Sequence, residues 1–457
     1  MNIYLHCEIS ARELDSKLLL ATLAAAKGHQ VIISSLSEII HGLKTGILAP
    51  GIFHTKSLTP SKNKIARHQK LIDEGCKITS IDEETGLRDS HEKFIKDRYS
   101  DLTIEQCSAA FGWGHEDVEA LKKISPKNLN KIHKTGSPRV DLWKSSFSEY
   151  WIDPKGMPSK PFLLISSNLS CFTIKKFVDH FKFVKDAGYL DRNPDMLRAM
   201  FYRSSDQYKM FYLFLDTIKY ISKNNIGYDI VLRPHPEEDV EAWKIFLENI
   251  PNTHVIRQDS ITAWIKNAFA VMHNGCTTAL ETTVSGKPLL TFDPFSVENS
   301  QEIFNTLGYN IKTKEQLLIK ANDIFNSSKT NNQKKIEAKI SEKISHKLYI
   351  DNRELAAEKI LKIWDSLNDT SLSKSNNWAK FYLLIKFIKI TRVSRNILGK
   401  LFPKKFKHIS ENYKFPSFDE NDIRKRVDRL QSLLGIEKKL ECKFFSDRTL
   451  LIKEISQ

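Results

Sequence analysis

The order in which short apolar runs and helical patterns alternate most constrains the fold of this chain. The segment NIYLHCEI (residues 2–9) has the composition of a buried strand, and residues 13–27 carry leucines at helical spacing. Gly28 then ends the helix, and VIISS (31–35) begins a second strand. Strand, helix, glycine and strand in this order are typical of a parallel α/β unit. The sequence therefore predicts an α/β fold.

The same alternation continues far enough for two domains. Apolar runs that begin at residues 76, 108, 131, 162, 228, 253, 268 and 287 predict further strands. WIDPKGMPSKP (151–161) is rich in proline and glycine and predicts a linker. A chain of 457 residues has the length of two or three domains. We therefore expect one α/β domain over residues 1–155, a second over 160–366, and a cleft between them.

The remaining region, residues 370–457, is expected to be a basic, amphipathic helical extension. No acidic residue lies between Asp369 and Glu411, while residues 378–408 interleave large apolar side chains with Lys and Arg. The formal net charge of the chain, +15, also favours an anionic partner. We favour a helix that lies on an anionic membrane surface. The alternative is a helix that packs on the second domain and exposes a solvated basic face.

Two further features of the sequence bear on its location. No window approaches about 18 consecutive apolar residues, so no transmembrane helix is expected. The six cysteines are scattered and show no metal-ligand spacing. They predict free thiols in a reducing cytosol.

The segment after the apolar run 268–272 predicts an anion-binding turn. A glycine and small hydroxyl residues precede a helical pattern there, so a phosphate can approach the unpaired backbone N–H groups of the helix start. A glutamate one turn later is placed to accept hydrogen bonds from ribose hydroxyls. The alternative is a tight turn that needs glycine for packing only. The ligand-binding residues expected from this segment are His273, Asn274, Gly275, Thr277, Thr278 and Glu281.

A second segment of the same domain, VLRPHPEED (231–239), carries a cation and an imidazole at a strand end. Two prolines fix the backbone around His235, and Arg233 offers bidentate hydrogen bonds to a phosphate. Ligands of parallel α/β domains bind beyond the carboxyl ends of strands, where Asn168 is also expected. With the turn at Gly275, these residues predict a nucleotide mono- or diphosphate site. Neither GxxxxGK[ST] nor GxGxxG occurs, which disfavours P-loop and dinucleotide sites.

Polar residues after the first strand predict the catalytic edge of the first domain. A carboxylate there can act as a general base toward a sugar hydroxyl or as a nucleophile. Capping and ion pairing at a helix start are the alternative role. The catalytic candidates are Glu8, Glu13 and Asp15. The second-tier candidates, expected to contact the acceptor substrate, are Arg12, Lys17, Lys56, Ser57, Arg139 and Asp141.

Several of these segments occur in an order that resembles a known family. EISARELDSKLLLATLAAAKGHQVIISS, GIFHTKSLTPSK, GWGHED, KTGSPRVDL, FLLISSN, VLRPHPEED and HNGCTTALE follow one another across residues 8–281. The pattern resembles the bacterial surface carbohydrate biosynthesis protein family. That family is similar to glycosyltransferases of the GT-B type, in which an N-terminal acceptor domain and a C-terminal nucleotide-sugar domain, both Rossmann-like, face a cleft. Its second domain resembles transferases that use CMP-activated Kdo, sialic, pseudaminic or legionaminic acid.

The resemblance also implies roles for individual residues. The pair His235-Pro236 matches the His-Pro that contacts the CMP phosphate, and Thr277-Thr278 matches a hydroxyl-rich helix start that binds the same phosphate. The acidic Asp/Glu-Asp/Glu-Gly motif of sialyltransferases is not evident in the first domain, so the identity of the catalytic carboxylate stays open. Such transferases generally need no metal, which agrees with the absence of a DxD motif, and we expect no cofactor.

The function that the resemblance implies is transfer of an acidic ulosonic sugar, Kdo or a nonulosonic acid, from its CMP donor to a lipopolysaccharide or capsule glycan. The expected location is cytoplasmic, peripheral on the inner membrane through residues 378–408. Another GT-B enzyme, such as a polyol-phosphate transferase or a UDP-sugar 2-epimerase, is the enzymatic alternative. A basic nucleic-acid-binding protein is the non-enzymatic one, but no recognised nucleic-acid module occurs, so no nucleic-acid partner is expected.

Overall fold

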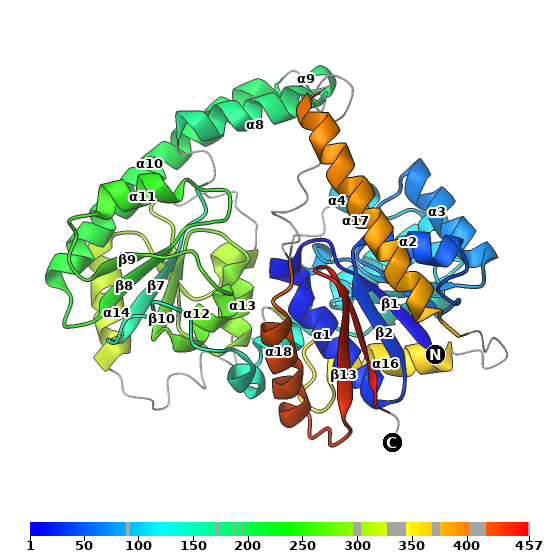
Figure 1. Cartoon of the computed structure of the whole chain (residues 1–457). Coiled ribbons are helices and arrows are strands. Elements are labelled where there is room, and N and C mark those ends of the chain that lie inside the picture. The colour runs from blue at the N-terminus through cyan, green and yellow to red at the C-terminus, as the bar shows by residue number, and fades with distance from the viewer. Residues whose placement is uncertain are drawn as a thin grey trace. The chain divides into compact units, whose positions relative to one another are not determined.

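Two β-sheets organise the computed structural model, which describes residues 1–87, 92–169, 173–186, 188–193, 195–295, 303–326, 344–367, 375–401 and 417–455. The chain divides into two units. Unit 1 contains Met1–Leu142 and Ile344–Gln457, and unit 2 contains Trp143–Lys343. Each unit has its own sheet with helices around it (Figure 1). The expected α/β class is therefore confirmed.

The sheet of unit 1 has eight strands in the order β13-β14-β2-β1-β3-β4-β5-β6. Strands β1 to β6 are parallel, and β1 lies between β2 and β3. The strand bounds are β1 Asn2–His6, β2 Gln30–Ser34, β3 Ile52–Thr55, β4 Lys77–Ile81, β5 Ala109–Gly112, β6 Ile132–Lys134, β13 Leu440–Ser446 and β14 Thr449–Glu454. Because the first six strands are parallel, their carboxyl ends meet at one edge of the sheet.

The helices of unit 1 follow from the apolar spacing of the sequence. Helix α1 buries Leu14, Leu18 and Leu19, and the turn after it contains Gly28 at φ +84°, a conformation that favours glycine. The bounds are α1 Ser10–Ala26, α2 Leu36–Lys44, α3 Lys62–Asp73, α4 Glu92–Arg98, α5 Asp101–Glu105, α6 His115–Ile124, α7 Pro138–Trp143, α16 Ala356–Ser366, α17 Trp378–Leu401 and α18 Glu420–Leu433, with short 3₁₀ turns η1 Thr85–Leu87 and η2 Leu129–Lys131.

The C-terminal residues belong to unit 1, which differs from the boundaries expected from sequence. Residues 344–366 were expected in the second domain, and 370–457 as a separate helical extension. Instead β14 pairs antiparallel with β2, with Leu451 opposite Ile32, and β13 pairs with β14 (Figure 1, red). Helices α16 and α18 pack on α1. The physical reason is burial: the apolar residues of β14 complete the sheet, which gives them a partner that a free extension lacks.

The sheet of unit 2 has six parallel strands in the order β12-β11-β10-β7-β8-β9. Its core includes Phe214, Trp243 and Met272, all fully buried. The strand bounds are β7 Phe162–Ser166, β8 Asp229–Arg233, β9 Thr253–Val255, β10 Ala270–His273, β11 Leu289–Phe292 and β12 Tyr309–Ile311. The helices are α8 Ile174–Asp186, α9 Tyr189–Arg192, α10 Met196–Asn224, α11 Val240–Leu247, α12 Ile261–Asn267, α13 Thr278–Val284 and α14 Lys314–Asn326, with 3₁₀ turns η3 Ser145–Tyr150 and η4 Ile303–Thr306.

Two bulk expectations from the sequence concern the described part of the chain only. Among these helices, none has the length and apolarity needed to cross a bilayer. The five cysteines that the structure describes are Cys7, Cys76, Cys107, Cys276 and Cys442, and all are buried free thiols. Cys171 lies outside the described residues.

Candidate functional site

Three neighbouring strands of unit 2 end in one row. Ser166, the last residue of β7, lies opposite Arg233, the last residue of β8, and opposite His273, the last residue of β10. The loops that start at Pro234, Ser167 and Asn274 therefore leave the sheet side by side. This register agrees with the prediction from sequence that the three segments leave the same edge of the sheet.

The loops after β7 and β10 are joined by the side chains of two asparagines. The backbone N–H of Asn168 donates to Oδ1 of Asn274 at 2.9 Å, and Nδ2 of Asn168 donates to the carbonyl of Gly275 at 2.9 Å. Ser166 Oγ lies 3.2 Å from Oγ1 of Thr278. Asn168 and Asn274 thus hold the turn in place, and their polar atoms bond to each other's loops.

His273 lies beneath the turn. The residue is fully buried, with Nε2 2.9 Å from Oγ1 of Thr291. Its Nδ1 accepts the N–H of Gly275 at 3.1 Å and lies 3.4 Å from the N–H of Cys276. Burial lowers the pKa of His273 to about 3, so the ring is neutral and can accept at Nδ1. His273, which was expected to bind a ligand, instead supports the backbone of the turn at Gly275.

The backbone conformation at Gly275 favours glycine. Its φ is +82°, and a Cβ placed on it would lie 2.8 Å from Oδ1 of Asn305. Helix α13 starts at Thr278, and Thr277 precedes it as an exposed N-cap whose hydroxyl makes no capping hydrogen bond. The turn therefore offers a small, exposed hydroxyl at the edge of the sheet.

Arg233 and His235 occupy the end of β8. Both Nη atoms of Arg233 donate to backbone carbonyls, those of Gln258 and Asp259. Burial lowers the pKa of Arg233 to about 10, although Asp259 and Glu281 favour its charged form. The guanidinium thus holds the loop before α12 through two hydrogen bonds. The sequence analysis predicted that the same two donors would bind a phosphate.

His235 is half-buried, and its Nδ1 accepts the backbone N–H of Glu237 at 3.3 Å. Burial lowers its pKa, with Glu237 acting in the opposite direction. Glu281, expected to meet ribose hydroxyls, is buried and accepts from Oγ1 of Thr262. His235 is therefore the predicted residue of this loop whose ring is both positioned and partly accessible.

One buried carboxylate that sequence reasoning missed connects the β7 and β8 loops. Glu238 accepts from Ser167 Oγ at 2.7 Å and from Trp243 Nε1 at 2.7 Å through Oε2, and from the N–H of Leu169 at 2.6 Å through Oε1. Burial raises its pKa, and these hydrogen bonds oppose that shift. The signal was present in the sequence as an acid within the Pro-rich loop.

In unit 1, the three predicted catalytic carboxylates have different environments. Oε2 of Glu8 lies 2.6 Å from Nζ of Lys56, and its side chain is 37% exposed. Glu13 is fully buried and accepts the N–H of Glu8 at 2.8 Å and Arg12 Nη2 at 3.1 Å. Asp15 accepts from Arg426 of α18 at 2.7 Å. Glu8 is thus the candidate among the three that combines exposure with a position at the strand end.

The strand end of β4 adds carboxylates that sequence reasoning did not use. Glu83 pairs with Lys17 at 2.8 Å, and its backbone carbonyl accepts from Arg139 at 3.1 Å. The segment reads Asp82-Glu83-Glu84, directly after the apolar strand. Three consecutive acids at a strand end were the available signal, because parallel strands place such residues at the ligand edge.

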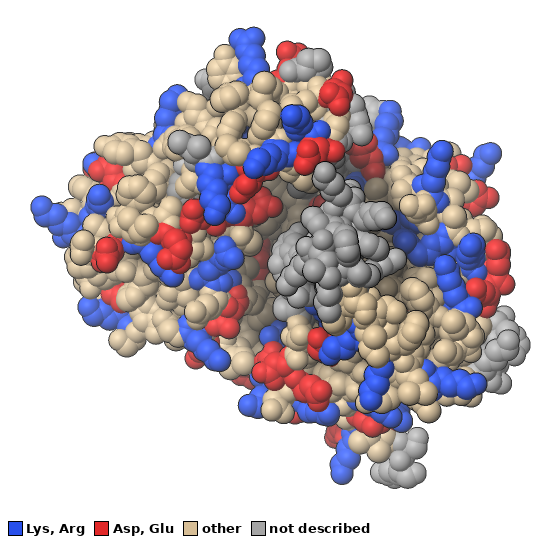
Figure 2. All heavy atoms as spheres, turned by 45° about the horizontal axis from the view of Figure 1, so that its top comes forward, with Lys and Arg blue, Asp and Glu red and all other residues tan. Residues whose placement is uncertain are grey.

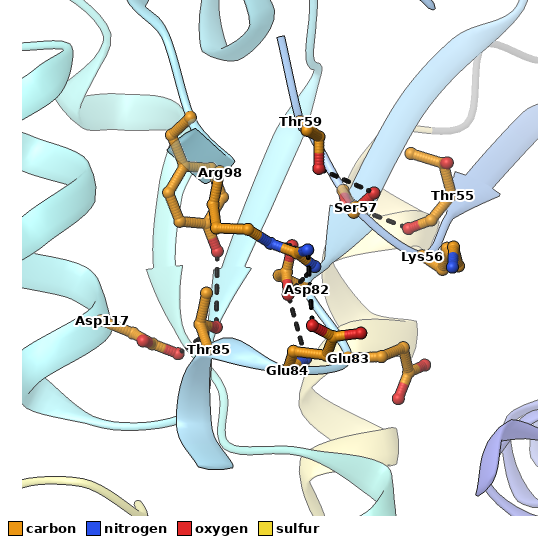
Figure 3. Close-up of polar contacts among 12 residues, drawn as sticks. Thr55, Lys56, Ser57, Thr59, Asp82, Glu83, Glu84, Thr85, Arg98 and Asp117 are labelled. Carbon is orange, nitrogen blue, oxygen red and sulfur yellow. Dashed lines mark hydrogen bonds and ion pairs between the residues drawn. The ribbon is translucent and has the colours of Figure 1, made fainter. Parts of the chain in front are cut away.

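Asp82 and Glu84 share Arg98 (Figure 3). Arg98 donates to both oxygens of buried Asp82, with distances of 2.7 to 3.0 Å, and its Nη1 lies 3.4 Å from Glu84. Burial raises the pKa of Asp82, and Arg98 opposes this. Glu84 also meets Arg12 at 3.3 Å and is 30% exposed. It is a second accessible carboxylate at this edge.

Ser57 joins the same edge from β3. Lys64 donates to its Oγ at 2.8 Å and to its carbonyl at 3.1 Å, and Thr59 lies 3.4 Å away (Ser57 and Thr59 in Figure 3). Burial lowers the pKa of Lys64 to about 8, with Arg67 acting in the same direction. Of the two predicted residues, Lys56 therefore contacts Glu8, and the neighbouring Ser57 contacts Lys64. The predicted Asp141 does not: it is buried and accepts the N–H of Ala357 at the start of α16.

Within the residues that the structure describes, no group of three or more His, Cys, Asp or Glu is arranged to hold a metal ion. The expectation that the protein needs no metal stays a prediction.

Comparison with known proteins supports the fold. No protein-family model matches this chain, and no curated protein does. A solved structure from Listeria monocytogenes, provisionally named a UDP-N-acetylglucosamine 2-epimerase, matches with a TM-score of 0.50 at 14% identity, covering 82% of this chain and 97% of its own. The wall teichoic acid polymerase TagF (H548A) matches with a TM-score of 0.42 at 10% identity, covering 71% and 74%. A glycosyltransferase from Rickettsia africae matches with a TM-score of 0.44 at 12% identity, covering 82% and 99%.

The likeness to the Listeria structure defines a class by fold alone. The chain has the GT-B-like fold, with two Rossmann-like units. The expected fold is thus confirmed, and the resemblance to the surface carbohydrate family stays a prediction.

Proposed function

We propose that this protein is a glycosyltransferase that moves an acidic ulosonic sugar, Kdo or a nonulosonic acid, from its CMP donor to a lipopolysaccharide or capsule glycan. The observation that supports the proposal is that β8 and β10, which precede His235 and the turn at Gly275, flank β7 on its two sides and end level with it. The donor class comes from the resemblance of the RPHP and HNGCTT segments to CMP-sugar transferases.

In this proposal, unit 2 takes the donor. His235 donates to the phosphate of CMP, and the exposed Thr277 hydroxyl adds a second donor. Arg233 acts by holding the loop before α12 and by its positive charge near the site. Asn168 and His273 fix the backbone of the turn; because the Gly275 N–H already donates to His273, the turn serves the ligand through the exposed Thr277 hydroxyl.

Unit 1 takes the acceptor. Glu8 receives the proton of the acceptor hydroxyl, whose oxygen forms a bond to the anomeric carbon. The bond between that carbon and the phosphate oxygen breaks, and CMP leaves with the electron pair. Cationic and N–H donors stabilise the charge that develops on the phosphate. We propose that no metal takes part, since the leaving group is a monophosphate.

A panel of nucleotides tests the donor class. In a thermal-shift titration, CMP should raise the melting temperature more than UMP or GMP at equal concentration, because a ligand that binds only the folded state stabilises it. EDTA should leave the CMP shift unchanged. A shift specific to UDP would favour the epimerase alternative, and CDP-glycerol turnover would favour a polyol-phosphate transferase. The absence of a shift with every cytidine nucleotide contradicts the proposal.

A further inference from the structure

Helix α17 carries two apolar stripes on opposite sides. Phe381, Ile385 and Ile388 form the first and are 0%, 3% and 9% exposed. Leu383, Phe387 and Ile390 form the second and are 64%, 63% and 63% exposed. Each stripe has the spacing i, i+4, i+7, and the two are offset by two residues, which is about 200° around a helix. One face of α17 is therefore buried, while the other is equally apolar and open.

The buried stripe fixes α17 on unit 1. The ring of Phe381 lies 5.2 Å from that of Phe445 in β13, and Trp378 stacks on Phe445 at 5.6 Å. Near the middle of the helix, Arg392 pairs with Glu38 of α2 at 3.0 Å. These contacts, together with the packing on α2 and β13, set the rotation of the helix about its axis. The second stripe is thus exposed because the first is anchored, on the helix that Figure 1 draws in orange.

The charged side chains of α17 itself are all basic. Lys380, Lys386 and Lys389 are exposed, and no Asp or Glu occurs anywhere in α17. Lys386 also lies over the ring of Tyr382, with Nζ 4.5 Å from the centroid. Elsewhere, on the face shown in Figure 2, Lys and Arg are interspersed with Asp and Glu. The all-basic composition is therefore a property of α17 and not of the face shown in Figure 2.

We propose that the exposed stripe of α17, Leu383, Phe387 and Ile390, docks on the surface of an anionic lipid bilayer. Large apolar side chains enter the boundary between headgroups and acyl chains, and lysines beside them reach the lipid phosphates while their stems stay apolar. A nucleic acid would pair with the charge of the lysines, but it would not remove the apolar stripe from water. Because the opposite face of α17 is buried on unit 1, the helix lies along the bilayer surface in this proposal. Residues 402–408 of the expected basic segment lie outside the described residues.

Vesicle co-sedimentation of the full-length protein tests this inference, which does not depend on the proposed reaction. Wild-type protein should bind phosphatidylglycerol-containing vesicles and bind pure phosphatidylcholine vesicles weakly. The variant Phe387→Asp/Ile390→Asp should lose binding by about tenfold or more, and Lys386→Glu/Lys389→Glu should lose a similar factor on anionic vesicles only. Because all four side chains are exposed, circular dichroism and the nucleotide thermal shift should stay unchanged.

A matched control lies on unit 2. Ile245 and Phe246 of α11 are 70% and 52% exposed, and Ile245→Asp/Phe246→Asp should bind vesicles like wild type. Equal binding by wild type and the α17 variants overturns the proposal. So does a dimer, seen by light scattering, that only the Phe387→Asp/Ile390→Asp substitution dissociates, since the stripe is then a protein interface. RNA that binds more tightly than anionic vesicles also overturns it.

Discussion

The ammonium group of Lys17 lies 2.8 Å from Oε1 of Glu83, and the two side chains are only 1% and 4% exposed. This ion pair joins α1 to the loop after β4. Removing one partner leaves an uncompensated buried charge, which typically costs about 3–5 kcal/mol. We expect Glu83→Gln and Lys17→Met each to lower the urea midpoint of unit 1 substantially. The double variant Lys17→Met/Glu83→Leu should recover part of the loss. An exposed pair is the control: Glu119→Gln, which breaks the contact with Lys122, should leave the midpoint unchanged.

Glu8 and Asp15 should separate in activity assays. Glu8→Gln keeps the shape of the side chain and removes the base, so we expect turnover to fall by about two orders of magnitude or more. Asp15→Asn should stay within a few-fold of wild type, because its partner is Arg426 of α18. Turnover is measured with a CMP-sugar donor at saturating acceptor. If Glu84→Gln loses activity and Glu8→Gln keeps full activity, the general base is Glu84 and not Glu8.

His235 should be required for donor binding. His235→Ala removes the half-buried ring at the end of β8, and we expect turnover to fall by about two orders of magnitude without unfolding. His254→Ala provides the control within the same unit: His254 pairs with Asp229 at the opposite end of β8, 2.9 Å away. Activity at the wild-type level in His235→Ala would remove the basis for the nucleotide site.

Glu238 should act through the loops that it connects. Glu238→Ala removes the acceptor of Ser167, Leu169 and Trp243, so we expect weaker nucleotide binding together with a loss of stability of about 1–3 kcal/mol for each unpaired donor. The neighbouring Glu237 is exposed, and Glu237→Ala should change neither. Nucleotide affinity that survives a clear drop in melting temperature would mean that Glu238 serves stability alone.

Stability should fall as the pH is lowered. Burial lowers the pKa of His6, His68 and His273 to about 3, below the ordinary value of 6.5. Between these two values the unfolded chain binds protons at three histidines that the folded protein does not, so their contribution to stability is complete above pH 6.5 and declines as pH falls toward 3. Burial raises the pKa of Asp117 to about 7, and this one group acts in the opposite direction. Urea midpoints measured at pH 7, 6 and 5 should decrease in this order. His273→Gln should flatten the decline, whereas substitution of the exposed His41 should not.

Much of the fold could be predicted because the signals were local. Glycine after α1 and apolar runs at the strands mark the parallel units in the sequence itself. The hairpin β13-β14 could not be assigned in this way, since its partner β2 lies more than 400 residues earlier, as the contact of Thr449 with Ser34 shows (sequence separation 415). Basic and apolar residues in the preceding segment drew attention to α17 and away from the hairpin.

The candidate site was predictable in position but not in role. Strand ends located Arg233, His235 and the Gly275 turn, because parallel topology alone sends them to one edge. The local sequence does not show which acceptor each hydrogen-bond donor will meet once the side chains pack. Arg233 donates to the backbone carbonyls of Gln258 and Asp259, a choice that depends on a loop more than 20 residues away (sequence separations 25 and 26).

The pairing of β14 with β2 also has a consequence for synthesis. Strand β2 of unit 1 is synthesised early, whereas β14 (Thr449–Glu454), which pairs with it, is synthesised much later. Unit 2 lies entirely within this interval, so it is able to fold on the ribosome while the earlier unit is still incomplete. Nascent unit 1 therefore exposes the unpaired side of β2 until Thr449–Glu454 have been synthesised, the period in which chaperone binding or aggregation is most expected.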